Sequence, residues 1–217
     1  MELFSTIIAW YMAHINYLTI TILMAIESTF IPLPSELVVP PAAWLAAQGQ
    51  MSLFFVIFFS SLGCVIGAII NYTLSFYLGR QIIYGLADSK LAKLFFINKT
   101  KIEHAEQYFR NNGNTSTFIG RLIPGIRHLI SIPAGLAKMN LKKFILFTFI
   151  GSGLWNIVLA LLGFSIARVF PDIKNAKDVA TKATQYSHEI SYITLGIGIV
   201  FVIYLIVKNR KRIKNKS

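Results

Sequence analysis

Residues 27–41 decide the fold, and they read Glu27-Ser28-Thr29-Phe30-Ile31-Pro32-Leu33-Pro34-Ser35-Glu36-Leu37-Val38-Val39-Pro40-Pro41. Two carboxylates and four prolines stand here among apolar side chains. Proline lacks the backbone donor that a helix needs, and its ring clashes with the preceding turn. The segment therefore cannot form one straight helix.

The chain around this segment is too poor in charge for a soluble protein. Of its 217 residues, 55% are hydrophobic and 14% are charged, whereas soluble domains carry about 25% charged residues. Long runs without a charged residue include 37–79, 144–167 and 190–207. Each is close to or above the roughly 20 apolar residues that cross a bilayer. The composition predicts an all-α, multi-pass membrane protein and excludes a soluble enzyme.

The basic residues predict the orientation. The net charge is +12, and six lysines and arginines follow the last apolar run within residues 208–217. Such a cluster is typical of a cytoplasmic flank beside anionic lipid. We interpret it as a topology anchor and expect no nucleic-acid partner. With residues 80–143 also starting and ending in the cytoplasm, both termini are expected to be cytoplasmic.

The broken segment is expected to dip into the membrane and return. Irregular backbone at membrane depth is stable only where protein or a water-filled cavity covers it. This predicts a re-entrant element at 27–48, with Pro32 and Pro34 at its bend, and a second at 115–139, with Pro124 and Gly125 at its bend.

The rest of the chain is expected to complete a single domain, 1–217. Its other membrane helices are predicted at 3–26, 51–79, 141–167 and 190–207. Between and after them we expect a cytoplasmic amphipathic linker at 81–114, which ends at residues 111–114, a polar loop at 168–189 and a basic tail at 208–217.

An internal repeat relates the two broken elements. A shift of 88 residues places 51–80 on 139–168 without a gap, with nine identities in thirty positions, where about three are expected from so apolar a composition. The repeats cover 27–80 and 115–168. Because the basic residues place both ends of the linker on one side, the two halves run in opposite directions. Inverted repeats of this kind are the recurrent architecture of secondary transporters.

Four charged residues remain inside the apolar body: Glu27, Glu36, Arg121 and Arg127. Each costs at least about 2.5–3.5 kcal/mol at bilayer depth and so needs a partner or water. One interpretation is that salt bridges close the two bends against each other. The other is that Arg121 and Arg127 bind a phosphate, because guanidinium matches phosphate oxygens bidentately, while Glu27 and Glu36 relay a proton or act as a gate. The two interpretations are compatible.

Other residues carry packing roles in this interpretation. Gly63 and Gly67 permit close helix approach, Cys64 is a small buried hydrophobe, Trp155 faces lipid or core, and His128 is hydrogen-bonded. The histidines lack metal-ligand spacing, and no phosphate-loop or nucleophile motif occurs. We therefore expect no catalytic residues, no metal and no cofactor.

Two motifs resemble those of a known family. They are Glu27-x4-Pro32-x-Pro34-x-Glu36 and Gly120-Arg-Leu-Ile-Pro-Gly-Ile-Arg127, the latter continuing to Ile132-Pro-Ala-Gly-Leu-Ala-Lys-Met139. Over roughly residues 26–168 the chain is similar to the DedA family of membrane proteins, also described as SNARE-associated or VTT-domain proteins. The resemblance implies two opposed re-entrant loops. It also implies that the protein moves undecaprenyl phosphate or phosphatidylethanolamine across the membrane. In several members of the family this movement depends on the proton-motive force.

On this resemblance, Glu27, Glu36, Arg121 and Arg127 match the functional residues of the family. Gln48 and Asn71 are neutral where members often carry Asp. The leading prediction is a lipid transporter of the bacterial plasma membrane, with a phosphate-bearing lipid and protons as partners. The alternative is a proton-coupled small-molecule or cation exporter. An enzyme acting on lipid phosphate and a structural scaffold rank lower, and a homo-oligomer stays open.

Overall fold

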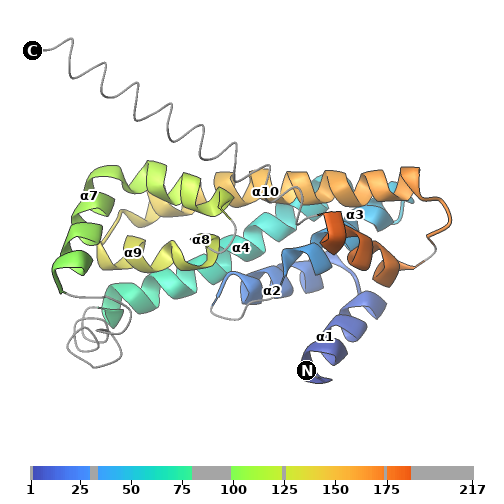
Figure 1. Ribbon diagram of the computed structural model, residues 1–217, viewed down its shortest axis with the longest axis horizontal. Coiled ribbons are helices and arrows are strands. Elements are labelled where there is room, and N and C mark those ends of the chain that lie inside the picture. Colours follow the sequence, from blue (N-terminus) through green and yellow to red (C-terminus); the bar gives the residue numbers. More distant parts are fainter. Residues whose placement is uncertain (1, 30–33, 80–98, 124–125, 174, 187–217) are drawn as a thin grey trace, which may run out of the picture.

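The computed structural model describes residues 2–29, 34–79, 99–123, 126–173 and 175–186, and within these ranges the chain is helical apart from short connections, with no strand (Figure 1). The predicted all-α class is confirmed. The helix predicted at 190–207, the tail at 208–217, and Pro32, Pro124 and Gly125 lie outside the described residues.

Two long apolar helices form the axis of the molecule. Helix α4 covers Leu53–Tyr77 and α10 covers Leu141–Val169, and both are long and apolar enough to cross a membrane. They match the helices predicted at 51–79 and 141–167. They touch near their middles, where Asn156 Nδ2 donates to Ser61 Oγ at 3.2 Å and the rings of Phe58 and Phe149 meet edge to face.

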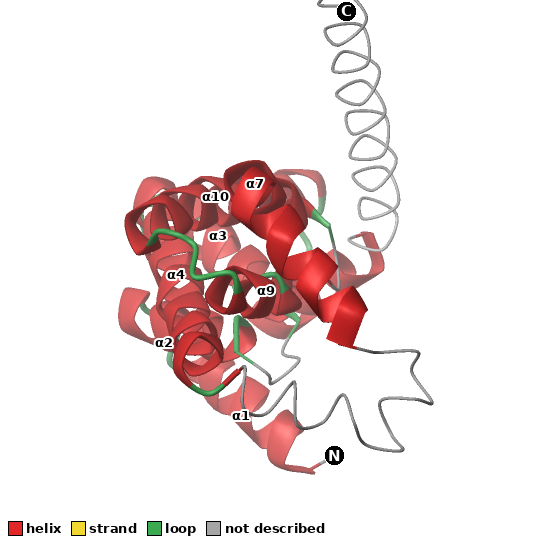
Figure 2. Cartoon of the chain, turned by 90° about the vertical axis from the view of Figure 1, so that its left-hand side faces the viewer, coloured by secondary structure: helices red, strands yellow, loops and turns green. Residues whose placement is uncertain are grey.

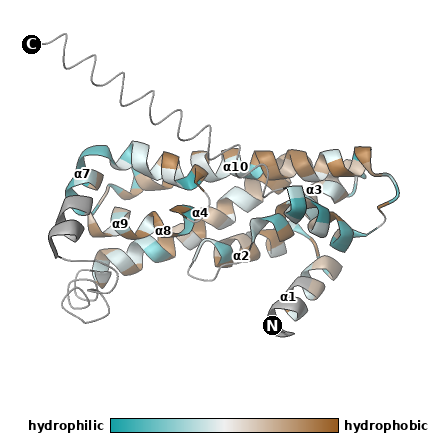
Figure 3. Ribbon diagram, in the orientation of Figure 1, coloured by the Kyte–Doolittle hydropathy of each residue, from teal (hydrophilic) through white to brown (hydrophobic). Residues whose placement is uncertain are grey.

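The outer faces of these two helices are apolar. On α10 a stripe of exposed side chains recurs every three or four residues, so that it follows one helix face; it consists of Leu146, Ile150, Leu154, Ile157 and Leu161, which are 39–54% exposed. Figure 3 shows hydrophobic colours along α10 and polar colours at the turn that follows it. An apolar face of this length is covered by lipid in a membrane protein.

The first hairpin differs from the prediction of one helix over residues 3–26. Helix α1 (Glu2–Ala13) ends early, and α2 covers Tyr17–Glu27. Asn16 separates them: its side chain accepts from the backbone N of Thr19, and the Thr19 hydroxyl accepts from the backbone N of Asn16, each at 3.0 Å. This reciprocal cap starts a new helix. Helix α2 is therefore the first limb of the hairpin, which begins before residue 27.

The hairpin returns through a short 3-10 turn, η1 (Ser35–Leu37), and α3 (Val39–Ala47). Pro34 precedes η1 with extended backbone angles (φ −68°, ψ 121°). Pro40 and Pro41 occupy the first turn of α3, where the missing backbone donor has no consequence. Pro34 thus lies at the start of the turn, and Pro40 and Pro41 lie at the start of the return limb. The role of Pro32 and Pro34 at a re-entrant bend stays a prediction.

The second hairpin consists of α7 (Lys99–Leu122), α8 (Ile126–Leu129) and α9 (Ser131–Leu136). The sequence predicted that residues 111–114 end a helix. Instead α7 continues through them and bends at Asn112, whose backbone (φ −126°, ψ 15°) is not helical. A single residue outside the helical region kinks a helix without ending it. Helix α7 therefore joins the predicted linker to the second broken element.

Each hairpin packs on both long helices. Helices α2 and α9 pack on α4, whereas α7 and α3 pack on α10. Figure 2, an end view, shows α7 and α10 on one side of the bundle and α2 on the other, with α4 and α9 between them. The first limb of each hairpin contacts the long helix that follows it, and the returning limb contacts the other long helix.

Small residues fix these contacts at equivalent positions. A Cβ on Gly63 would lie 2.8 Å from Met24 Cβ of α2, and a Cβ on Gly151 would lie 2.8 Å from Arg121 Cβ of α7. Likewise α9 meets α4 at Ser75, and α3 meets α10 at Gly163. Positions 63 and 151, and positions 75 and 163, are each 88 residues apart, the shift at which the sequence repeats.

The predicted polar loop at 168–189 contains a helix. Residues 176–186 are helical. Their side chains Val179 and Ala183 are buried against Trp44 and Ile166. The apolar residues of this segment recur every three or four positions, so they form one buried helix face. The prediction of a loop followed from its many polar residues.

Candidate functional site

Residues beside the two bends, Glu27 and Ser28 in one hairpin and Arg121 and Arg127 in the other, lie together between the middles of α4 and α10. Helix α4 is about 38 Å long at 1.5 Å per residue, which is long enough to cross a bilayer core of about 30 Å. A cavity of about 10 Å³ lies among these residues and the two long helices, and it is lined by Met24, Glu27, Ser28, Cys64, Arg121, Arg127, Ser152, Trp155 and Asn156. That volume is at the lower limit for one water molecule.

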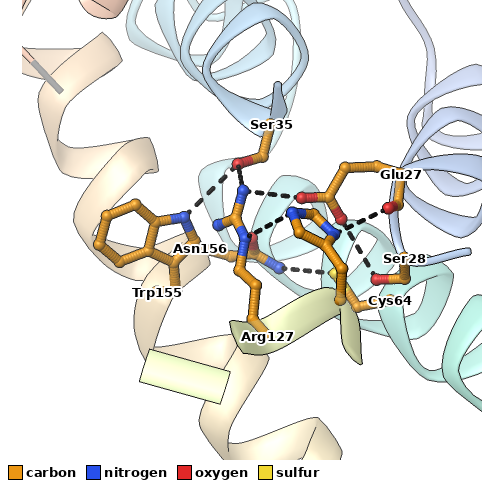
Figure 4. Close-up of polar contacts among 8 residues, drawn as sticks. Glu27, Ser28, Ser35, Cys64, Arg127, Trp155 and Asn156 are labelled. Carbon is orange, nitrogen blue, oxygen red and sulfur yellow. Dashed lines mark hydrogen bonds and ion pairs between the residues drawn. The ribbon is translucent and has the colours of Figure 1, made fainter. Parts of the chain in front are cut away.

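Arg127 links the two hairpins. Its Nη2 lies 2.8 Å from Oε1 of Glu27, at the end of α2, and donates to Ser35 Oγ at 2.9 Å. Its guanidinium also stands over the ring of Trp155, 5.4 Å from the ring centre. Figure 4 shows the Arg127 side chain between Trp155 on one side and Glu27 on the other. The predicted salt bridge between the bends is formed by this one pair.

Glu27 is held in place from several sides. The residue is only 2% exposed, and Ser28 Oγ donates to its Oε2 at 3.2 Å. Its backbone oxygen lies 3.0 Å from His128 Nδ1, which donates in the tautomer with Nδ1 protonated. The hydrogen-bonding role predicted for His128 is present, and it adds a second link between the hairpins.

Arg121 forms no ion pair with a carboxylate in the described ranges. It is 2% exposed, and its Nη2 donates to Ser131 Oγ at 2.9 Å. Its Nε has no hydrogen-bond partner, and no carboxylate among the residues with described positions lies within ion-pair distance. Two guanidiniums and one carboxylate thus line the cavity, which leaves one positive charge uncompensated. Burying an unpaired charge is strongly unfavourable, and an anion would remove that penalty.

Glu36 stands apart from this cluster. It lies in η1, is partly exposed, and forms no ion pair within the described part of the chain. The structure therefore brings three of the four predicted charged residues together, namely Glu27, Arg121 and Arg127, and Glu36 does not line their cavity.

Sequence reasoning missed the serines that hold the guanidiniums. Ser35 and Ser131 are fully buried, and each accepts a hydrogen bond from one arginine. Ser35 also lies 3.5 Å from Trp155 Nε1. Their positions in the sequence could have identified them. Ser35 stands between Pro34 and Glu36, and Ser131 comes four residues after Arg127. Trp155 is 3% exposed, so the core alternative of its interpretation is confirmed.

Two buried asparagines flank the cavity. Asn71 Nδ2 donates to the backbone oxygen of Ser28 at 3.0 Å, and Asn156 Nδ2 lies 3.2 Å from Ser61 Oγ and 3.9 Å from Cys64 Sγ. The side-chain oxygen of each has no hydrogen-bond partner. Within the ranges that the structure describes, no group of three or more His, Cys, Asp or Glu is placed to hold a metal ion.

These features define a class: a helical membrane protein in which two bent hairpins bring a buried, cationic site to the middle of two spanning helices. The chain belongs to the VTT-domain, or DedA, family, because the VTT domain matches residues 28–165. A Lactococcus lactis subsp. lactis IL1403 protein named alkaline phosphatase-like protein is 32% identical over 213 residues, which cover 97% of this chain and 95% of that protein.

Two relatives carry a transporter's name. Undecaprenyl phosphate transporter A of Bacillus subtilis 168 is 29% identical over 98% of both chains. The protein of the same name from Staphylococcus aureus NCTC 8325 is 27% identical over 96% of this chain and 98% of its own length. No solved structure shows significant similarity to the chain.

Proposed function

We propose that this protein carries undecaprenyl phosphate, a phosphate-bearing lipid, across the bacterial plasma membrane, with Arg121 and Arg127 holding the phosphate. The observation that carries the proposal is the burial of Arg121 without a carboxylate partner, beside a second arginine in the same cavity. The names of the Bacillus and Staphylococcus relatives support the choice of lipid.

Phosphate suits this site for electrostatic and geometric reasons. Guanidinium groups bind phosphate through paired, charge-assisted hydrogen bonds, and they stay charged when buried. In the present arrangement the arginines instead contact two neutral hydroxyls and one carboxylate. A phosphate carries more charge than either hydroxyl and would replace them as the acceptor. The long acyl chain would meanwhile remain in lipid along the apolar faces.

The cavity is too small for the substrate, so transport requires the hairpins to separate. A cavity of about 10 Å³ cannot hold a phosphate group. An entering phosphate would take Arg127 from Glu27 and thereby release the link between the bends. In this scheme Glu27 is the gate, and a proton taken up by the freed carboxylate would couple transport to the proton gradient. Glu36, being partly exposed, is the proposed relay toward water.

We also propose that the hairpins are re-entrant elements of two inverted repeats. Their symmetric contacts on α4 and α10, at positions 88 residues apart, support this arrangement. Inverted repeats that meet at the midplane open alternately to the two sides by rocking against each other. The expected orientation keeps both termini in the cytoplasm.

A flipping assay tests the proposal. Purified protein is placed in liposomes with fluorescent undecaprenyl phosphate, and an impermeant quencher reports movement between leaflets. We expect Arg121→Gln or Arg127→Gln to lower the rate at least about tenfold, because each removes a charge-assisted contact. Arg168→Gln, which alters an exposed arginine at the far end of α10, is the matched control. Flipping unchanged by both site variants would overturn the proposal.

The same liposomes separate the alternatives. A pH-sensitive dye detects the substrate-driven proton movement without lipid flipping that a small-molecule or cation exporter would produce. Release of phosphate from the lipid would indicate an enzyme instead. The positive excess beside Arg121 opposes cation binding, so we expect lipid movement and no phosphate release. Labelled phosphatidylethanolamine, run in parallel, tests the choice of lipid.

A further inference from the structure

A second cavity lies at the end of the molecule where α7 bends. Its volume is about 390 Å³, and its walls are residues 109–115 of α7 and residues 137–140 with Lys143, which connect α9 to α10. The kink at Asn112 and the close contact between Gly113 and Met139 shape it: a Cβ on Gly113 would lie 3.1 Å from the Met139 sulfur. The volume falls in the range of small-molecule sites.

The lining of this cavity is cationic and rich in amides. Arg110, Lys138 and Lys143 line it, and no Asp or Glu does. All three side chains are exposed, and Arg110 contacts Glu106 at a distance of 3.8 Å. Four asparagines in the lining add amide donors. Three cations together with neutral donors form a site for an anion such as a phosphate.

The backbone holds one of these cations in a restrained position. Lys138 has φ +51°, a left-handed conformation that is uncommon for residues other than glycine. Its Nζ lies over the ring of Phe76, 5.5 Å from the ring centre. A backbone of this kind is maintained where the surrounding structure fixes it, so the Lys138 main chain holds a defined place in the wall of the cavity.

For an α10 that crosses the membrane, this cavity lies at the boundary of the hydrocarbon core. It is next to the first turn of α10, directly before the charge-free run that starts at residue 144, and the end of an apolar span marks the boundary of the hydrocarbon core. The lipid-facing stripe of α10 begins close by, at Leu146. Gly113 and Arg121 are eight residues apart on α7, or about 12 Å along the helix.

We propose that this cavity binds the phosphate of a lipid head group at the membrane boundary. It would act as a loading site, separated from the buried arginines by about 12 Å of α7. The proposal extends the transport function proposed above, but its binding step can be measured without transport. The ligand class is a lipid monophosphate whose chain lies along α10.

Binding of geranyl phosphate to the full chain in detergent tests the loading site. Calorimetry of the wild-type protein is compared with a variant that carries Lys138→Gln and Lys143→Gln. We expect the affinity to fall at least about tenfold, because two charge-assisted contacts are lost. Lys142→Gln, an exposed neighbour that does not line the cavity, should stay within about twofold. Equal affinity of the double variant and the wild type would overturn the proposal.

Three further arms identify what is bound. Geraniol, which lacks the phosphate, should not bind, and inorganic phosphate should bind at least about tenfold more weakly than geranyl phosphate because it lacks the chain. Inorganic phosphate that binds equally well would overturn the lipid assignment. Arg121→Gln should leave this affinity within about twofold, because Arg121 does not line this cavity; a tenfold loss there would assign the binding to the buried arginines instead.

The flipping assay distinguishes this inference from the function on which it rests. The double lysine variant should need more lipid to reach half of its maximal rate and should keep that maximal rate. We expect loss of flipping at every lipid content only in the variants Arg121→Gln and Arg127→Gln. Flipping that survives in the arginine variants would defeat the proposed function while leaving the calorimetric result on the loading site intact.

Discussion

At the scale of single residues, Arg121 and Arg127 carry the same charge but differ in their partners. Arg127 is neutralised by Glu27 across the two hairpins, whereas the polar partner of Arg121 among the described residues is the hydroxyl of Ser131. A buried ion pair adds little net stability, yet removing one partner leaves a buried charge that is very unfavourable. The two arginines should therefore respond differently to substitution.

We predict that Glu27→Gln lowers the free energy of unfolding by about 3–5 kcal/mol, because Arg127 loses its only carboxylate partner among the described residues. The double variant Glu27→Gln with Arg127→Gln should recover part of this loss, since no unpaired charge remains. Chemical unfolding in detergent, followed by tryptophan fluorescence, measures both. Losses that simply add in the double variant would show that the pair does not interact.

Removal of the unpaired charge of Arg121 should not lower the free energy of unfolding, in contrast to Glu27→Gln. Arg121→Gln removes a buried positive charge that forms no ion pair with a described residue, so we expect unchanged or higher stability together with the loss of lipid flipping. A melting temperature that rises while transport disappears is the expected combination. An Arg121→Gln variant with a lower melting temperature that still flips lipid would contradict the assignment of Arg121 to the substrate.

At the scale of elements, close contacts between helices depend on small residues. Gly67 of α4 lies against α2, where a Cβ would be 2.8 Å from Ser28 Cβ and would also collide with the backbone oxygen of Ala25. Gly153 of α10 has more room, with Ser61 Oγ at 3.5 Å from a Cβ. The two glycines therefore form a matched pair for testing the packing.

We predict that Gly67→Ala destabilises the protein by about 1–3 kcal/mol through overpacking. Gly153→Ala should be neutral or stabilising by up to about 1 kcal/mol, because alanine favours a helix over glycine. Melting temperatures of the two purified variants decide the matter. Equal shifts would mean that α2 can move away from α4 without loss.

Helix α2 exists as a separate limb because of its cap. Asn16→Ala removes the acceptor for the backbone N of Thr19, and we predict a loss of about 1 kcal/mol. Asn16→Ser keeps a capping oxygen and should restore most of it. Hydrogen exchange of the first turn of α2 should rise in the alanine variant only; protection that stays the same in both would argue against the cap.

The long helices and the proline-broken elements could be predicted because each follows from a local pattern, a charge-free run or a proline. The break before α2 could not, because Asn16 sits in an apolar run, and only the partner at Thr19 turns it into a cap. Nor could residues 111–114 be recognised as a bend, since asparagine and glycine are equally typical of a helix end. The pairing of Arg127 with Glu27 instead of Glu36 depends on the path of the hairpin and is invisible in sequence spacing.

At the scale of the whole molecule, described residues beside the bends of both hairpins line one small cavity, and the single cysteine of the chain lies there. Cys64 is 5% exposed and lines the small cavity with Arg121 and Arg127. Its chemical reactivity therefore reports whether the hairpins are apart, without any added label site. A closed cavity of about 10 Å³ excludes a maleimide.

We predict slow labelling of Cys64 by N-ethylmaleimide in wild-type liposomes, and labelling at least about tenfold faster in Arg127→Gln. In this variant the ion pair between the hairpins is absent, and a population shift of about 1.4 kcal/mol suffices for a tenfold change. Undecaprenyl phosphate should accelerate labelling of the wild type, because it competes with Glu27 for Arg127, whereas undecaprenol should not. Mass spectrometry of the intact protein follows the reaction, and Cys64→Ser gives the background. Rapid labelling of the wild type without lipid, or rates equal in all samples, would mean that the link between the hairpins does not control access to the centre of the protein.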